Sequence, residues 1–295
     1  MRNPIALTGL LAILVWSSGA LSSADEPLFT FVQISDAHVG NPANLPEHKR
    51  LIAAVRLANL LEPDFVIDTG DLTSSPVYEA SPENLAEYDQ YKEYVAPLKM
   101  PLYTVPGNHD IGYWRTEGRT RKGGKPWGDY DELVEAYKEK MGPLDQSFTH
   151  KGIHFILFNF NPPMSREPGH LTEEQFAWIE AELEQSETAF LFCHVQLLKN
   201  GEGPVWGDSA RRLVALIREH NVAAVAYGHQ HQLHNVTLHG TQYIMCPDLK
   251  VPDHQSICQY RVYSDHFDLW LYDVFSHEGT QLGSYPYPRA AVAAE

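Results

Sequence analysis

The feature that most constrains this chain is an apolar run that ends in a sharp turn and is followed by three polar residues. Residues 103–105 read as the end of a strand, a Pro-Gly pair forces the turn, and Asn108, His109 and Asp110 come next. Three adjacent polar side chains are poorly suited to a core, whereas a strand end holds them rigidly over a cleft. The sequence therefore predicts a site here, with partners at the ends of other strands.

The rest of the chain alternates β-branched and aromatic runs with helical patterns, which is typical of an α/β domain. We expect strands over residues 28–34, 65–67, 102–105, 147–150, 153–159, 189–193, 222–227, 235–239, 241–246, 257–263 and 267–272. The order of these runs predicts one domain, residues 25–288, with a mixed core of sheets. Residues 289–295 are expected to form a loose tail, and the chain from Gly279 onward to be loosely held.

Several local signals predict where helices lie. Residues 83–95 and 130–140 have helical patterns, and Pro63 ends an earlier helix. Thr172 and Gln175 have the spacing of a capping box. We expect Asp208 or Ser209 to cap the helix that carries Leu213 and Leu216.

The N-terminus has the pattern of an export signal. Arg2 supplies a positive residue, residues 5–16 a short apolar core, and Ser22-Ser23-Ala24 a cleavage site. We therefore interpret residues 1–24 as a secretory signal peptide and expect an exported protein, periplasmic or secreted. The apolar stretch is short for a bilayer span, and the mature protein should contain no membrane span. A retained membrane anchor is the alternative.

Charge and cysteine content exclude two further classes. The chain has 38 Asp and Glu against 22 Lys and Arg, so its surface should repel a nucleic-acid duplex. Its three cysteines do not make a disulfide scaffold. Cys246 and Cys258 flank one loop and either pair or remain as two buried thiols, while Cys193 reads as core.

Polar residues that can bind metals follow five of the predicted strands. These residues are Asp36, His38, Asp71, Asn108, His194, His229 and His231. Imidazole and oxygen donors without thiolate suit Zn, Mn or Fe. Seven ligands are too many for one ion and about right for two divalent ions that share a carboxylate.

Each of these motifs, taken alone, has an ordinary structural explanation that involves no metal. A single His-x-His is more often a surface or core pair, and Gly-Asp at a strand end is commonly a turn or a helix cap. Five such signals at strand ends in one α/β chain are not expected by chance. Asp68 stays ambiguous: it either supports a ligand histidine or is the last polar residue of its strand.

Together these motifs resemble those of calcineurin-like metallophosphoesterases, over roughly residues 29–248. The matching segments, in the order of that family, are Asp36-x-His38, Gly70-Asp71, Gly107-Asn108-His109-Asp110, His194 and Gly228-His229-x-His231. The resemblance implies a four-layer α-β-β-α metallophosphoesterase sandwich with two central mixed sheets. It is strongest to the class III cyclic-nucleotide phosphodiesterase branch, from which Val195-Gln196 departs.

The resemblance also implies a role for each residue. Asp36, His38 and His231 would bind one metal, Asn108, His194 and His229 the other, and Asp71 would bridge them. His109 would stand beside the leaving group, with Asp110 as the carboxylate that orients its ring.

This arrangement makes chemical sense on its own terms. Two cations about 4 Å apart lower the pKa of a bridging water and hold a phosphoryl group for in-line attack by the resulting hydroxide. An imidazole beside the leaving oxygen can donate a proton near neutral pH. We therefore expect a metal-dependent hydrolase of small phosphoesters that favours phosphodiesters. The alternatives are a phosphomonoesterase or divergent protein phosphatase, and a catalytically silent binding protein with the same fold.

A glycine-rich connection, residues 112–128, is the remaining segment whose composition suggests a function. It concentrates basic residues in an acidic protein and follows Asp110 directly, so it should lie beside the site. The predicted substrate-binding residues are Arg115, Arg119, Arg121 and Lys122. The alternative is an ordinary solvated surface loop.

Overall fold

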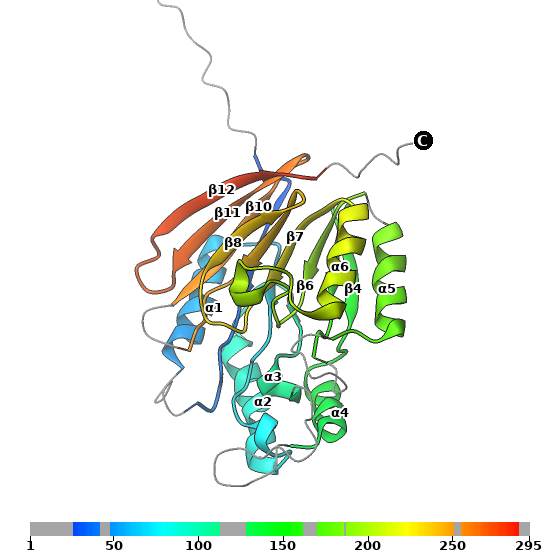
Figure 1. Ribbon diagram of the computed structural model, residues 1–295. Helices are drawn as coiled ribbons and strands as arrows, with labels where there is room; N and C mark the ends of the chain where they lie inside the picture. The colour runs from blue at the N-terminus through cyan, green and yellow to red at the C-terminus, as the bar shows by residue number, and fades with distance from the viewer. Residues whose placement is uncertain are drawn as a thin grey trace, which may run out of the picture.

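The computed structural model describes residues 26–41, 48–112, 128–161, 170–185, 187–250 and 255–288. Two six-stranded sheets dominate this part of the chain (Figure 1). The first has the order β12-β11-β10-β1-β2-β3 and the second β4-β5-β6-β7-β9-β8. The strands of the first sheet are β1 (Phe29–Ile34), β2 (Phe65–Asp68), β3 (Leu102–Thr104), β10 (Ser256–Val262), β11 (His266–Asp273) and β12 (Gly279–Pro286). Those of the second are β4 (Gln146–His150), β5 (Ile153–Leu157), β6 (Ala189–Phe192), β7 (Val222–Tyr227), β8 (His234–Leu238) and β9 (Thr241–Met245).

Both sheets are mixed, and their parallel strands determine where a site can form. In the first sheet β1, β2 and β3 run parallel, and the other pairings are antiparallel. In the second sheet β5, β6, β7 and β9 run parallel. The carboxyl ends of parallel strands share one edge of a sheet, which is where α/β proteins place their ligands.

Helices cover the outer faces of the two sheets, giving four layers. α1 (Lys49–Leu61), α2 (Pro82–Val95) and α4 (Tyr130–Lys140) share an apolar cluster with the first sheet. α5 (Glu173–Glu184) and α6 (Gly207–Glu219) share one with the second sheet, at the right in Figure 1. The four-layer sandwich with two mixed sheets is therefore confirmed. Short helices complete the described elements: η2 (Pro76–Tyr78), α3 (Asn108–Ile111) and η3 (Lys199–Gly201).

Aromatic side chains fill the space between the sheets. The ring of Phe31 on β1 stacks on Phe65 and on Tyr260, with centroid distances of 5.4 and 4.3 Å. Its edge contacts reach Phe155 and Phe190 of the other sheet at 5.4 and 5.6 Å. Buried aromatic pairs of this geometry stabilise a core by more than the burial of their surface area alone. They therefore hold the inner faces of the two sheets in a fixed relation.

Most predicted elements agree with the structure to within one or two residues. The helix at 130–140 and the strand at 222–227 have the predicted bounds. The capping box is confirmed, because Thr172 Oγ1 accepts from the Gln175 amide and Gln175 Oε1 accepts from the Thr172 amide, both at 3.2 Å. Cys246 and Cys258 are free and buried, which confirms the thiol alternative.

Two local predictions were wrong. The chain from Gly279 is not loosely held, because β12 pairs with β11 along the sheet edge. Its exposed residues lack apolar alternation, and backbone pairing stabilises it instead. The helix of residues 207–219 is not capped by Asp208 or Ser209, since Trp206 precedes it without a side-chain cap. Ser209 Oγ instead accepts from the Leu171 amide at 3.2 Å.

Three other predictions lie outside the described residues. They concern the signal peptide at 1–24, the tail at 289–295, and the loop that carries Arg115, Arg119, Arg121 and Lys122. Within the described ranges, no helix is both long enough and apolar enough to cross a membrane.

Candidate metal centre

The loops that follow β1 and β2 run side by side at the edge of the first sheet. The amides of Asp36, His38 and Val39 donate to the carbonyls of Gly70, Asp71 and Leu72, each at 2.9 Å. This ladder extends the parallel pairing of the two strands beyond their ends. It fixes the Asp-x-His segment and the Gly-Asp segment in register with each other.

Loops of the second sheet reach the same place. The amide of Gly228 donates to the carbonyl of His194 at 3.1 Å, and the amide of His229 to Asp36 Oδ2 at 3.0 Å. The second bond crosses from one sheet to the other. The edges of both sheets therefore meet at one site.

Four of the predicted ligands form a first cluster: Asp36, His38, Asp71 and His231. His231 Nε2 lies 3.2 Å from Asp36 Oδ1 and 3.3 Å from His38 Nε2. His38 Nε2 lies 3.4 Å from Asp71 Oδ2. One atom from each residue lies within 4.8 Å of the others, which is the spacing of donors around a single ion.

A second cluster contains Asp71, His194 and His229. His194 Nε2 lies 3.3 Å from Asp71 Oδ1 and 3.3 Å from His229 Nδ1. Asn108 Oδ1 adds an amide oxygen 3.2 Å from the same nitrogen. All seven predicted ligands are thus brought together.

Asp71 belongs to both clusters through different oxygens. Oδ2 faces His38 and Oδ1 faces His194, and Oδ1 also accepts from the His109 amide at 2.7 Å. A carboxylate divided in this way can share its charge between two cations.

The donors fit divalent cations for two further reasons. Asp36 Oδ1 is fully buried, and the polar side-chain atoms that face it, His231 Nε2 at 3.2 Å and His38 Nε2 at 3.8 Å, are themselves predicted ligand atoms. Buried carboxylate oxygens are costly unless a proton donor or a cation satisfies them. The donor set of imidazole, carboxylate and amide oxygen suits Zn, Mn or Fe.

Hydrogen bonds on the far side of two histidines orient their rings. His194 Nδ1 lies 2.8 Å from the carbonyl of Thr69, to which it donates. His38 Nδ1 lies 3.2 Å from Ser74 Oγ, whose own proton goes to the His38 carbonyl at 3.3 Å. Both contacts leave Nε2 as the free ligand atom, the usual arrangement at protein metal sites.

The backbone at the site adopts conformations that other residues avoid. Five predicted ligands have a positive φ, between 46° and 77°: Asp36, His38, Asp71, His229 and His231. Left-handed backbone in non-glycine residues costs of order 1 kcal/mol or more each, and it clusters at functional sites. The surrounding loop hydrogen bonds maintain this geometry.

Gly107 and Gly228 permit the close approach of these loops. A Cβ on Gly107 would lie 2.8 Å from Asp71 Cα and collide with the Asp71 amide. A Cβ on Gly228 would collide with Ser35 Oγ and with Asp36 Oδ2. No residue larger than glycine fits either position without displacing a ligand.

The charges and the burial of the site strongly shift the pKa values of its carboxylates and histidines. Burial raises the pKa of Asp36, but a hydrogen bond from His231 and the charge of His194 outweigh this effect and lower it below its usual range. The pKa of Asp71 is lowered in the same way by His194 and His109. Burial lowers the pKa of His38 to about 3 and of His229 to about 4.

His194 is the exception among the buried histidines. Burial lowers its pKa, but the charge of Asp71 and the hydrogen bond to it outweigh burial and raise the pKa to about 10. Without a cation, the proton on His194 is therefore the positive charge that compensates Asp71.

The predicted relation between His109 and Asp110 was wrong. His109 Nδ1 lies 2.9 Å from the carbonyl of Ser74, to which it donates. The Asp110 carboxylate accepts from the amides of Leu72 (3.2 Å), Thr73 (2.9 Å) and Gly107 (2.8 Å) and from Thr73 Oγ1 (2.7 Å). None of these described bonds reaches His109. Asp110 instead holds the loop that follows β2 and carries Asp71 (the Asp71 loop). Burial and the charge of Asp71 raise its pKa to about 6.

Asp68, which had two possible roles, does not support a ligand histidine. Its Oδ2 accepts from the Tyr91 hydroxyl at 2.7 Å and its Oδ1 from the Gly70 amide at 3.1 Å. Burial raises its pKa well above the usual value. It is the last residue of β2 and ties that strand to α2.

Sequence reasoning missed the supporting residues. Gln33 Nε2 donates to Thr69 Oγ1 at 3.1 Å and to the Tyr227 carbonyl at 3.2 Å, which links the two sheets beneath the clusters. A buried glutamine inside an apolar strand was the available signal. Ser74 binds His109 through its backbone carbonyl, and this role cannot be predicted from the residue type of Ser74.

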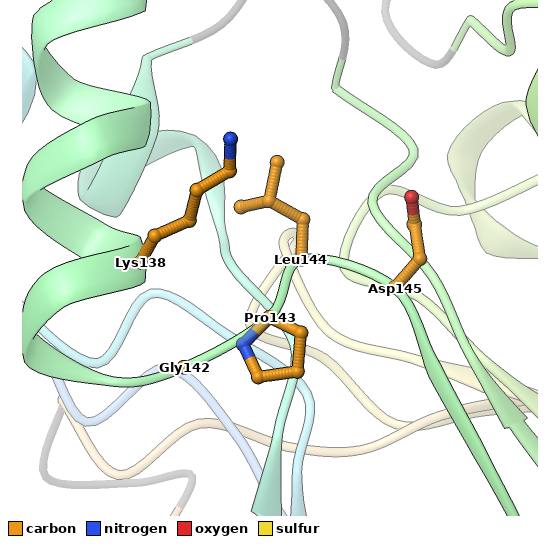
Figure 2. Close-up of a pocket in the computed structure, with 5 residues that line it drawn as sticks. All are labelled: Lys138, Gly142, Pro143, Leu144 and Asp145. Atoms are coloured by element: carbon orange, nitrogen blue, oxygen red, sulfur yellow. The ribbon is translucent and has the colours of Figure 1, made fainter.

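A separate concavity lies between the end of α4 and the start of β4 (Figure 2). Its volume is about 620 Å³, and its lining contains none of the predicted site residues. Figure 2 shows Lys138, Leu144 and Asp145 pointing to the same side. Asp145 accepts from the Asn159 amide at 2.7 Å and from Gln175 Nε2 at 3.2 Å, so its carboxylate ties the end of β5 to α5.

Comparison with known proteins gives consistent results. A model of a family described as calcineurin-like phosphoesterase matches residues 29–233. The chain is 28% identical over 225 residues to a probable glycerophosphodiester phosphodiesterase of Arcobacter nitrofigilis, covering 68% of this chain and 71% of the relative. It is 26% identical over 240 residues to a probable cyclic nucleotide phosphodiesterase of Moraxella catarrhalis, covering 74% and 78%.

Solved structures confirm the fold. A dimetal phosphatase from Danio rerio superposes with a TM-score of 0.63 at 16% identity, covering 89% of this chain and all of the other. A purple acid phosphatase from yellow lupin gives 0.62 at 14% identity, covering 88% of this chain and 54% of the other. At these identities the likeness concerns the sandwich and no finer property.

Proposed function

The chain belongs to the calcineurin-like phosphoesterase family and is a metal-dependent hydrolase of phosphoric esters, and on this premise we propose that its substrates are small phosphodiesters. The names of its relatives support this preference, because they are glycerophosphodiester and cyclic nucleotide phosphodiesterases. The preference for diesters over monoesters is the part of the proposal that an assay must decide.

The observation that carries the two-cation part of the proposal is the placement of Asp71. Its two oxygens face two different donor clusters, at 3.4 Å from His38 Nε2 and 3.3 Å from His194 Nε2. We assign Asp36, His38 and His231 to one cation, Asn108, His194 and His229 to the other, and Asp71 to both. Two such cations, Mn, Fe or Zn, would supply the nucleophile and neutralise the phosphoryl oxygens.

The protein residues then complete the reaction. Asn108 contributes a neutral oxygen, which limits the negative charge facing an anionic ester. His109 is partly exposed beside the first cluster, with its ring centroid 4.6 Å from that of His38. Because its Nδ1 proton goes to Ser74, the imidazolium form of His109 carries its second proton on Nε2, gives that proton to the departing alcohol oxygen and becomes the neutral ring.

The test compares bis(4-nitrophenyl) phosphate with 4-nitrophenyl phosphate. The protein is loaded separately with Mn²⁺, Zn²⁺ and Fe²⁺, and His109→Ala is the matched variant. We expect higher kcat/KM for the diester, and a loss in the variant at unchanged metal content that is smaller than the factor of about 10² or more typical of general acid catalysis, because 4-nitrophenol is a good leaving group. A preference for the monoester would contradict the proposal. No turnover at two bound metals per chain would favour a silent binding protein.

We also propose that the protein is exported, on the evidence of residues 1–24 alone. Mass spectrometry of the protein recovered from cells should find a mature N-terminus near Asp25. A full-length chain in the cytosolic fraction would contradict export without affecting the catalytic proposal.

A further inference from the structure

Glu87, on the inner side of α2, binds the turn that follows the Asp71 loop. Its Oε2 accepts from two consecutive backbone amides, those of Ser74 at 2.9 Å and Ser75 at 2.8 Å. A carboxylate that accepts from two amides forms charge-assisted bonds, which are roughly twice as strong as neutral ones. No role in the site follows from the position of Glu87 in the sequence.

The peptide between Ser74 and Ser75 connects Glu87 to His109. Its N–H belongs to Ser75 and points to Glu87, and its carbonyl belongs to Ser74 and accepts from His109 Nδ1 at 2.9 Å. In a trans peptide the N–H and the C=O point in opposite directions. Fixing one end of this peptide therefore fixes the direction of the other. Bonds on both ends of one peptide also polarise and strengthen each other.

The fold makes room for this contact. Gly40 has a φ of 91°, and a Cβ there would run into the Glu87 carboxylate. The Ser74 amide also donates to the Val39 carbonyl at 2.9 Å, so the turn is held against the loop that carries His38. The turn, the loop after β1 and α2 thus enclose the Glu87 carboxylate.

We propose that Glu87 is a positioning residue for His109, acting through the Ser74–Ser75 peptide. The inference rests on the proposed function, because it concerns the delivery of a proton by His109 to the leaving oxygen. Without the Glu87 carboxylate the Ser75 N–H loses the acceptor that fixes the direction of the peptide, and the ring of His109 is held less firmly. The reaction should then depend more strongly on how good the leaving group is.

The kinetic test uses aryl methyl phosphates whose phenols range from 4-nitrophenol to phenol. With phenol as the leaving group, Glu87→Ala should lose about tenfold to a hundredfold more in kcat than with 4-nitrophenol, since a poor leaving group needs the proton most. Glu87→Gln keeps an acceptor without the charge and should fall between. Glu93→Gln removes an exposed carboxylate from the same helix and should match the wild type.

A double variant separates this role from a general loss of structure. Glu87→Ala in the His109→Ala background should add no further leaving-group discrimination, because both changes remove the same step. An equal loss for all leaving groups in Glu87→Ala, at full metal content, would overturn the proposal.

A measurement without substrate keeps this test independent of the proposed function. In the zinc-loaded protein, the Nδ1 proton of His109 should give a protected downfield NMR signal that is absent in His109→Ala. We expect the signal to be lost or broadened in Glu87→Ala and kept in Glu93→Gln. An unchanged signal in Glu87→Ala would overturn the role of Glu87, whether or not the wild type hydrolyses diesters.

Discussion

Removal of the metal ions should leave a proton on His194 far above the pH at which a histidine normally loses it. The ring is fully buried, its Nε2 lies 3.3 Å from Asp71 Oδ1, and its Nδ1 donates to the Thr69 carbonyl. Burial disfavours the imidazolium, but the charge of Asp71 outweighs it and raises the pKa of His194 to about 10. In the metal-free protein the proton and the Asp71 carboxylate form a buried ion pair.

The magnitude follows from the separation between this pKa and the working pH. At pH 8 the pKa of about 10 leaves roughly one neutral His194 ring in a hundred. A metal binds only the neutral ring, so binding must displace the proton at a cost of about 3 kcal/mol. Affinity at the second cluster should therefore rise about tenfold per pH unit up to the pKa. His229 and His38 add no such cost, because their pKa values of about 4 and 3 leave them neutral.

The assay is ¹⁵N NMR of the histidine rings in the metal-free protein, titrated from pH 6 to 10. We expect the His194 imidazolium to persist at pH 8, to become neutral when Zn²⁺ is added, and to be missing in His194→Gln. Asp71→Asn should bring the pKa of the ring down toward or below that of a free histidine, because burial then acts without the opposing charge. A neutral His194 at pH 8 in the metal-free wild type would refute the reasoning.

Three other substitutions test the supporting structure. Gly228→Ala should abolish metal binding at the first cluster, measured by metal analysis, because the added Cβ collides with Asp36 Oδ2; two bound ions per chain would contradict this. Asp110→Asn should lower the free energy of unfolding by about 1–3 kcal/mol in urea, since it weakens acceptance from Thr73 and its neighbours. Asp145 has a pKa raised by burial above 3.8, so its favourable contribution is present below that pH and is lost as the pH rises through the raised pKa. The stability of the wild type should thus fall relative to Asp145→Asn over that window, and a constant difference between pH 3 and 7 would contradict it.

The metal ligands could be predicted from the sequence because it shows both their residue types and their positions at the ends of predicted strands. A strand end followed by Asp, His or Asn is visible as an apolar run that stops at a polar residue. The parallel strands β1, β2, β3, β6 and β7 carry such ends to one edge of the sandwich. The positive φ at His38 or His231, in contrast, could not be predicted from the residue type, because histidine is enriched in that conformation among non-glycine residues but still adopts it in only a small fraction of cases.

The mistaken partner of His109 shows where this reasoning stops. Asp110 is adjacent to His109 in sequence and chemically suited to orient an imidazole. However, α3 begins at Asn108, and this helix directs the Asp110 carboxylate back to the Gly107 amide. A carboxylate there is worth more as an acceptor for loop amides that would otherwise be buried without partners. The ring is left to a backbone carbonyl, an acceptor that every residue has. A sequence shows which side chains can act in a site, and the backbone groups that aim them become visible only when the loops have been placed.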